Sequence, residues 1–357
     1  MLHRIIGGYE HGGGVHRATG ALELEHLNDG DRMTSQLDMF ARDVRPAAAR
    51  TERSRARRQA STSLSETEML AALKATGRYR ILRKLEARTV VSDVRPGFPL
   101  RGVILDTETT GLDARRCEVI EIGLVAFTYN AEGEIGDVVA VYGGLQQPTI
   151  AIPPDITRLT GITDAMVAGQ SIDIAAVQAI VGPADLIIAH NAGFDRPFCE
   201  ALSDVFVRKA WACSVSEIDW SGRGFEGTKL GYLIGQSGHF HDGHRAVDDC
   251  FALLEVLEQS ADGAKLPPFA ELYKASQRSR VRIFAENAPF DLKDVLKARG
   301  YRWSDGSDGR PKSWWTEVAE EELEAELGFL RKEIYRWDEA DPPTQRLTAF
   351  DRYRARR

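Results

Sequence analysis

The apolar positions in the middle of the chain predict strands that alternate with helices. Helices are expected to begin near Asp195 and near His244, and the second continues as far as Leu257. Strands are predicted by apolar runs near residues 102–107, 118–129, 137–143, 185–190 and 209–215. The expected result is an α/β domain, in which helices flank a sheet.

Both flanks of this region differ from it in pattern. Residues 1–65 lack a sustained apolar period and are rich in Gly, Arg, Ala and Ser, so we expect a disordered tail. Residues 66–99 form a basic segment, in which the apolar positions of residues 66–88 predict helices interrupted at Gly77. The main folded domain is therefore expected to span residues 100–262.

A second, smaller unit follows the boundary that Pro267-Pro268 marks. Residues 278–318 predict a small α/β module with a strand, a helix that ends at Gly300, and a hairpin across a Gly-rich turn. Residues 319–357 predict an acid-rich helix followed by a basic tail.

The predicted hairpin contains three tryptophans among basic residues. This arrangement can stack the bases of a single-stranded nucleic acid, whereas the same side chains can also form the small core of the module. We favour core packing for Trp303 and for one of Trp314 and Trp315, and leave the other open.

The strongest chemical signal lies at the end of the first predicted strand. Val103-Ile104-Leu105 leads into Asp106 and Glu108, which are two residues apart and therefore point to the same face of a strand. Two carboxylates this close repel each other unless positive charge lies between them. A divalent cation with oxygen ligands meets that need, and the alternative is a pair of surface acids at a strand end.

Two later segments place further acids beside apolar elements. An apolar run ends at His190, and Asp195 follows where a helix is expected. His244 and Asp249 lie at the start of the next helix, after a turn that Asp242-Gly243 predicts. Each residue also has an ordinary interpretation, because Asp195 can cap its helix and the other two can face solvent.

These residues together resemble the motifs of the DEDDh, or DnaQ-like, exonuclease family, which includes the proofreading subunit of the bacterial replicative polymerase. The match covers roughly residues 100–260, and Leu159-Thr160-Gly161-Ile162-Thr163 fits another recurrent family feature. The third family motif spaces its histidine and aspartate five residues apart, which selects Asp249 over Asp248. The residues that fall on the three motifs are Asp106, Glu108, Asp195, His244 and Asp249.

The resemblance implies a ribonuclease-H-like core with a mixed sheet. It also implies two Mg²⁺ ions, for which Mn²⁺ can substitute, held by the four carboxylates for in-line phosphoryl transfer. His244 would take a proton from the attacking water, because imidazole titrates near physiological pH. His239, His241 and His244 together suggest a zinc site, which we disfavour because no cysteine pair accompanies them.

A short motif in the N-terminal tail suggests a partner. Gln36-Leu37-Asp38-Met39-Phe40 resembles the pentapeptide by which bacterial proteins bind the replication sliding clamp, with Met39 in place of a leucine. An extended peptide of this kind would insert Leu37, Met39 and Phe40 into an apolar pocket, while Gln36 makes polar contacts. The alternative is an amphipathic fragment that folds onto its own core.

Composition and charge narrow the classes of function. The chain is 43% hydrophobic and 28% charged, as is typical of soluble globular proteins, and no apolar stretch approaches the length of a membrane span. Four cysteines without a Cys-x-x-Cys pair suit a reducing bacterial cytoplasm. Residues 101–260 hold 10 Lys and Arg against 23 Asp and Glu, a net charge of −13, so we expect the flanks to help hold nucleic acid.

The expected function is that of a metal-dependent 3′–5′ exonuclease that releases nucleoside monophosphates from single-stranded 3′ ends of DNA, in proofreading or repair. A sliding clamp and a separate DNA polymerase subunit are the expected partners. An exoribonuclease with the same chemistry is one alternative. A clamp-tethered adaptor without catalysis is another, and the intact set of acids argues against it.

Overall fold

The computed structural model describes residues 64–259, 266–307, 309 and 311–354. The clamp-like pentapeptide at residues 36–40 lies outside the described residues, as does nearly all of the predicted disordered tail. Within the described ranges, no helix combines the length and the apolar character that crossing a membrane requires.

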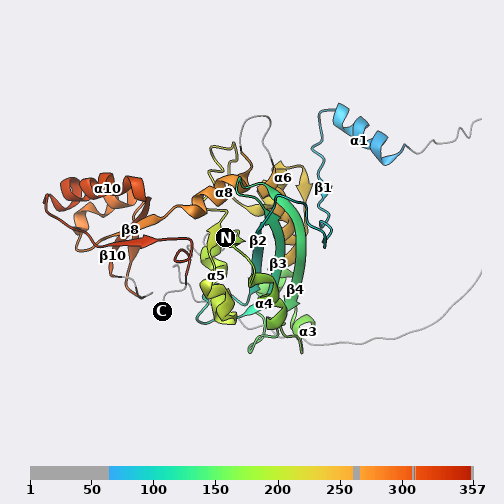
Figure 1. Ribbon diagram of the computed structural model, residues 1–357, viewed down its shortest axis with the longest axis horizontal. Helices are drawn as coiled ribbons and strands as arrows, with labels where there is room; N and C mark the ends of the chain where they lie inside the picture. The colour runs from blue at the N-terminus through green and yellow to red at the C-terminus, as the bar shows by residue number, and fades with distance from the viewer. Residues whose placement is uncertain (1–63, 260–265, 308, 310, 355–357) are drawn as a thin grey trace, which may run out of the picture. The chain divides into compact units, whose positions relative to one another are not determined.

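A five-stranded mixed sheet forms the centre of the main domain (Figure 1). Strand β3 (Val119–Tyr129) is antiparallel to both β4 (Ile135–Leu145) and β2 (Leu100–Thr109), whereas β5 (Leu186–Ala189) runs parallel to β2 and β6 (Trp211–Cys213) runs parallel to β5. The predicted α/β fold with a mixed sheet is confirmed. In spatial order the strands are β4 (Ile135–Leu145), β3 (Val119–Tyr129), β2 (Leu100–Thr109), β5 (Leu186–Ala189) and β6 (Trp211–Cys213).

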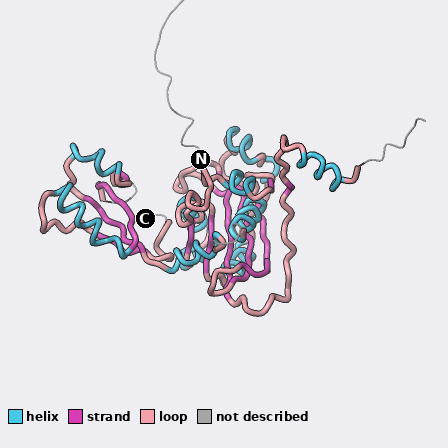
Figure 2. The backbone as a smooth tube through the Cα atoms, turned by 90° about the horizontal axis from the view of Figure 1, so that it is seen from above, coloured by secondary structure: helices cyan, strands magenta, loops and turns pink. Residues whose placement is uncertain are grey.

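Each face of this sheet has its own apolar core, because successive side chains of a strand point to opposite faces. Ile104 packs with α6 (Leu230–Gln236), α7 (Ala246–Glu258) and α8 (Pro268–Gln277), whereas its neighbour Val103 packs with α4 (Ile174–Val181) and α5 (Ala192–Leu202). Figure 2 shows helices on either side of the central strands. The continuous apolar runs of the sequence follow from burial on both faces.

The helices of this domain have the following bounds: α2 (Pro154–Thr160), α3 (Asp164–Val167), α4 (Ile174–Val181), α5 (Ala192–Leu202), η1 (Asp204–Arg208), α6 (Leu230–Gln236), α7 (Ala246–Glu258) and α8 (Pro268–Gln277). The two helices predicted to begin near Asp195 and His244 correspond to α5 and α7. Both begin within three residues of the predicted positions.

The segment before the sheet differs from the prediction. Instead of helices over residues 66–88, one helix, α1 (Glu66–Ala75), ends before Gly77, whose φ is 66°. The chain then forms β1 (Arg83–Lys84), which pairs in parallel with β7 (His239–Phe240). Strand pairing with a distant part of the sequence therefore overrides the local apolar period.

The C-terminal module is a four-stranded sheet in the order β11-β8-β10-β9, with α9 and α10 packed on one face. The predicted strand, helix and hairpin are present, and β11 is an additional strand that lies between the acid-rich helix and the basic tail that the sequence predicts. The elements are β8 (Arg280–Ala285), η2 (Phe290–Leu292), α9 (Lys293–Ala298), β9 (Arg302–Ser304), β10 (Ser313–Ala319), η3 (Glu320–Glu322), α10 (Leu323–Phe329), η4 (Leu330–Tyr335) and β11 (Thr344–Leu347).

Residues 348–354 contact the main domain through buried charges. The fully buried guanidinium of Arg196 donates hydrogen bonds to backbone carbonyls between Ala349 and Arg352. Arg352 is also buried and pairs with the buried carboxylate of Glu217 at 3.2 Å. Buried charges are retained only when they are paired, and these partners come from distant parts of the sequence. This is why the structure differs from the tail that the sequence predicts.

Candidate active site

Three of the predicted acids meet at one end of the central sheet. Asp106 and Glu108 lie near the end of β2, and Asp249 lies in the first turn of α7. One carboxylate oxygen from each of the three residues lies within 4.8 Å of the others. Hard divalent cations prefer carboxylate oxygens grouped in this way, so the donor set fits such an ion.

The helix that carries Asp249 lies directly on β3. Gly123 of β3 pairs with Asp106 of β2, and a Cβ atom at position 123 would lie only 2.3 Å from the carbonyl carbon of Ala246. The thiol of Cys250 donates a hydrogen bond to the Gly123 carbonyl at 3.4 Å. A residue without a side chain therefore allows the first turn of α7 to approach the strand beside Asp106.

Glu121 of β3 fixes the start of the same helix. Its carboxylate accepts hydrogen bonds from the Ala246 amide at 3.0 Å and from the Arg245 guanidinium at 2.8 Å. A carboxylate at a helix N-terminus satisfies free amide groups and complements the helix dipole. Glu121 thus holds α7 in place beside the acids that end β2.

Asp195 lies next to the three-acid cluster without belonging to it. It is buried in α5, and its Oδ1 atom accepts hydrogen bonds from the Thr107 amide at 3.1 Å and the Thr107 hydroxyl at 2.8 Å. Thr107 lies between Asp106 and Glu108 in β2. The N-cap position of α5 is Asn191, so Asp195 does not cap this helix.

Burial raises the pKa values of Asp106, Glu108 and Asp195. Burial raises the pKa of Asp106 well above its usual range, and the charges of Asp195 and Asp249 add to the effect. Burial is also the largest cause that raises the pKa of Glu108 to about 8, followed by the charges of Asp249 and Glu121. Burial raises the pKa of Asp195 to about 7 against the hydrogen bonds from Thr107. A bound cation would relieve this mutual repulsion.

These pKa values predict that metal-free protein becomes less stable as the pH rises. Glu108 and Asp195 keep protons in the folded state that they lose in the unfolded state, so stability falls between about pH 4.5 and pH 8. We expect the melting temperature in EDTA to fall by roughly 5 °C or more over this range. Millimolar Mg²⁺ or Mn²⁺ should raise it more at pH 8 than at pH 5.

Asp106→Asn is the control for this prediction, because it removes one of the repelling charges. Its melting temperature in EDTA should depend less steeply on pH than that of the wild type. A wild-type melting temperature that rises with pH in EDTA, with no gain from metal at pH 8, would contradict this account of the site.

Two histidines, not one, contact Asp249. His244 is exposed with a φ of 66°, and its backbone amide donates to Asp249 Oδ2 at 2.8 Å. His241 is mostly buried, and its Nε2 atom lies 2.7 Å from Asp249 Oδ1. Sequence reasoning considered His241 only for zinc. In the part of the chain that the structure describes, the three neighbouring histidines do not group as metal ligands.

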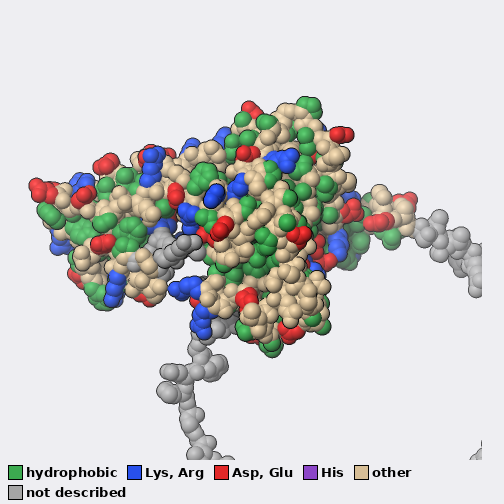
Figure 3. Space-filling view, turned by 60° about the horizontal axis from the view of Figure 1, so that its bottom comes forward, with side chains coloured by type: hydrophobic (Ala, Val, Ile, Leu, Met, Phe, Trp, Pro, Cys, Tyr) green, Lys and Arg blue, Asp and Glu red, His purple; other side chains and the backbone are tan. Residues whose placement is uncertain are grey.

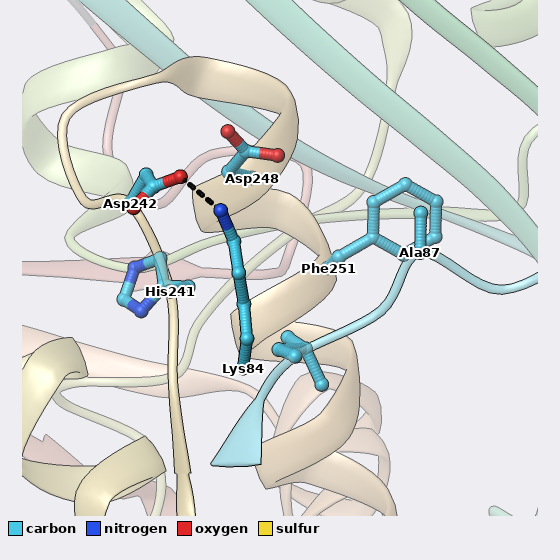
Figure 4. Close-up of a pocket in the computed structure, with 7 residues that line it drawn as sticks. Lys84, Ala87, His241, Asp242, Asp248 and Phe251 are labelled. Carbon is cyan, nitrogen blue, oxygen red and sulfur yellow. Dashed lines mark hydrogen bonds and ion pairs between the residues drawn. The ribbon is translucent and has the colours of Figure 1, made fainter. Parts of the chain in front are cut away.

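The loop that carries these histidines is held from outside by the N-terminal segment. Lys84 of β1 pairs with Asp242 at 2.6 Å, although both side chains are more than half exposed. Figure 4 shows this pair above a cavity of about 210 Å³, which is also lined by His241, Asp248 and Phe251. An exposed ion pair contributes little energy by itself, so the pairing of β1 with β7 and the contacts of His241 and His244 with Asp249 also restrain this loop.

Comparisons with known proteins identify the family. Residues 103–257 match the family model described as an exonuclease. The chain is 31% identical over 160 residues to the DNA polymerase III subunit epsilon of Treponema pallidum. This match covers 42% of this chain and 72% of that protein. It is also 31% identical over 178 residues to the PolC-type DNA polymerase III of Clostridium perfringens, covering 48% of this chain but 12% of that protein.

Among solved structures, exonuclease X in complex with 5′-overhanging duplex DNA aligns with a TM-score of 0.34 and 25% identity, covering 44% of this chain and 89% of that chain. Family membership rests on the sequence relatives, and the range of the family model, residues 103–257, includes Asp106, Glu108, Asp195, His244 and Asp249. The chain belongs to the DnaQ-like exonuclease family, as the motifs of its sequence predict.

Proposed function

We propose that this chain is a metal-dependent 3′–5′ exonuclease that hydrolyses DNA from single-stranded 3′ ends and releases nucleoside monophosphates. The observation that carries the proposal is the grouping of Asp106, Glu108 and Asp249, with Asp195 beside them. Family membership supports the reaction type, and the polymerase III names of the relatives favour DNA and a role in proofreading or repair.

Asp106, Glu108, Asp195 and Asp249 would together hold two divalent cations. When bound, Mg²⁺ ions, or Mn²⁺ in their place, would lower the pKa of a water molecule and stabilise charge on the phosphate. Thr107 orients Asp195 through two hydrogen bonds, so this carboxylate keeps one position beside β2. Ordered ligands of this kind reduce the cost of organising the site during reaction.

His244 is the residue to which we assign proton transfer. Its backbone is anchored to Asp249, while its imidazole is exposed at the start of α7, where it can reach the proton of a water molecule. His241 has a different role in this proposal, because its Nε2 atom is engaged with Asp249 and orients that carboxylate.

The proposed partners are a sliding clamp and a separate DNA polymerase subunit. The clamp would bind residues 36–40, whose sequence resembles a clamp-binding peptide. Tethering of this kind raises the local concentration of the enzyme at DNA without a tighter active site. The acidic main domain, with its net charge of −13, gains from such a tether because it attracts a polyanion poorly.

The experiment that tests the function uses single-stranded DNA and RNA of matched sequence, labelled at the 5′ end, with Mg²⁺. We expect a ladder of shortened labelled products on DNA, absent in EDTA and absent with Asp106→Ala. Faster cleavage of RNA than of DNA would show that the protein is an exoribonuclease with the same chemistry. No cleavage of either strand in Mg²⁺ or Mn²⁺ would favour the clamp-tethered adaptor.

A further inference from the structure

A strip of aromatic and lysine side chains, with an exposed ring at each end, crosses the C-terminal module. It consists of Phe290, Lys293, Lys297, Trp314 and Trp303, and we call it the aromatic–lysine strip. Its members come from η2, α9, β10 and β9, so separate elements of the module bring them together. Figure 3 shows hydrophobic side chains in contact with solvent, among both basic and acidic side chains, on the surface that the C-terminal elements form.

The two rings at the ends of the strip are open to solvent. Phe290 is 79% exposed and Trp303 is 50% exposed. Trp303 is exposed because β9 is an edge strand of only three residues, which corrects the core position that the sequence favours for it. Trp314, its partner across the β9–β10 pair, is buried and supports it at a centroid distance of 5.4 Å. Exposed rings such as these leave a face on which a nucleic-acid base can stack.

The two lysines of the strip lie over its rings. The Lys293 amine is 4.3 Å from the centroid of the Phe290 ring, and the Lys297 amine is 5.9 Å from the centroid of the Trp314 ring. The two residues are one turn apart in α9. Lys297 has only a long contact of 3.9 Å with exposed Asp294, and Lys293 is in no ion pair among the described residues. Both charges are therefore available to an anion.

We propose that the aromatic–lysine strip binds single-stranded nucleic acid. Bases would stack on Phe290 and Trp303, and backbone phosphates would lie against Lys293 and Lys297. Non-specific single-strand sites combine stacking rings and positive charge in this way. Binding is not limited to one sequence, because every base has a face that can stack.

Charge complementarity favours this occupant over an apolar protein segment. The whole module, residues 278–347, holds 13 Lys and Arg against 15 Asp and Glu, a net charge of −2, so its overall charge does not attract a polyanion. The positive charge is local: Lys293 and Lys297 lie beside the rings of the strip, and there they offer a phosphate backbone the attraction that the main domain lacks, with −13 over residues 101–260. This binding site goes beyond the proposed catalytic function, and it would keep the strand near the enzyme between cleavage steps.

The test measures binding without catalysis. Fluorescence anisotropy would measure binding of full-length protein, in EDTA, to a 5′-fluorescein-labelled oligothymidylate of about 20 nucleotides, a length that exceeds the roughly 4–16 nucleotides that a single-strand-binding OB fold covers. Phe290→Ala and Trp303→Ala should each raise Kd about 5- to 150-fold, as expected for the loss of one stacked base. Lys293→Ala with Lys297→Ala should lower the salt dependence of log Kd by about 0.7 per lysine.

Matched controls come from the same module. Trp337 is 60% exposed and outside the strip, so Trp337→Ala should keep Kd within about twofold of the wild type, as should Lys332→Ala. Because Phe290 and Trp303 are at the surface, their replacement should leave the melting temperature nearly unchanged. If Trp303→Ala lowers it, Phe290→Ala alone carries the test.

Failure of this inference can be told apart from failure of the proposed function. Strip variants should hydrolyse a dinucleotide at the wild-type rate, because none of the substituted residues belongs to the three-acid cluster, while KM for long DNA rises. Equal Kd values for strip and control variants would overturn the inference even if the enzyme cleaves DNA. The inference would also be overturned if the strip variants bound the oligothymidylate as tightly as the wild type but no longer bound a protein partner that the wild type binds.

Discussion

Asp249→Asn is expected to lower kcat for single-stranded DNA by about 1,000-fold or more, while Asp248→Asn retains activity within about twofold. A metal-holding carboxylate supports several kcal/mol of transition-state stabilisation, and each 1.36 kcal/mol corresponds to a factor of ten in rate. The two aspartates are adjacent in α7, but only Asp249 belongs to the three-acid cluster, whereas Asp248 is exposed to solvent. The measurement is single-turnover cleavage of 5′-labelled DNA in Mg²⁺.

Comparison of Asp249→Asn with Asp248→Asn separates the loss of a metal ligand from general effects on charge and on folding. Both changes remove one negative charge from the same helix turn, so a general electrostatic effect would appear in both variants. A loss of stability is not expected from Asp249→Asn in EDTA, because its charge contributes to the repulsion that raises the pKa values of Asp106 and Glu108. Equal activity of the two variants, or greater loss with Asp248→Asn, would show that the carboxylate cluster is not the catalytic site.

The central fold could be predicted because its signals are local and strong. Strands such as β3 and β5 are buried along their whole length, and burial on both faces produces a continuous apolar run in the sequence. The grouping of Asp106 with Glu108 follows from their spacing on one strand. The approach of Asp249 could be expected only from the family resemblance, since nothing in the sequence around α7 shows which strand it contacts.

The features that escaped prediction depend on contacts between distant segments. The pairing of β1 with β7 involves two residues on each side, which is too short to leave a period in the sequence. The sequence places Arg352 in a basic tail, because nothing in it shows that this side chain pairs with the buried carboxylate of Glu217. Trp303 has a large apolar side chain of the kind that usually lies in a core, and its exposure follows only from the position of β9 at the sheet edge. His241 likewise gains a role only through its contact with Asp249.

Gly123→Ala is expected to lower activity about 100-fold and to destabilise the protein by about 1–3 kcal/mol. The added Cβ would lie 2.3 Å from the Ala246 carbonyl carbon and 2.5 Å from the Val247 amide nitrogen. Both are backbone atoms, so no side-chain rotation relieves the overlap. Carbon atoms need about 3.5–4.0 Å, so the first turn of α7 must move by about 1 Å, and Asp249 moves with it.

Activity and stability must be measured separately to establish this cause. Cleavage should be assayed well below the melting temperature, together with the Mn²⁺ concentration that gives half-maximal activity, which should rise because the ligands separate. Gly231→Ala is the control, since position 231 in α6 has no heavy atom within 4 Å of the added Cβ. Alanine is favoured over glycine in a helix by about 0.5–1 kcal/mol, so this variant should be fully active and no less stable. Full activity of Gly123→Ala would mean that the contact between β3 and α7 does not set the position of Asp249.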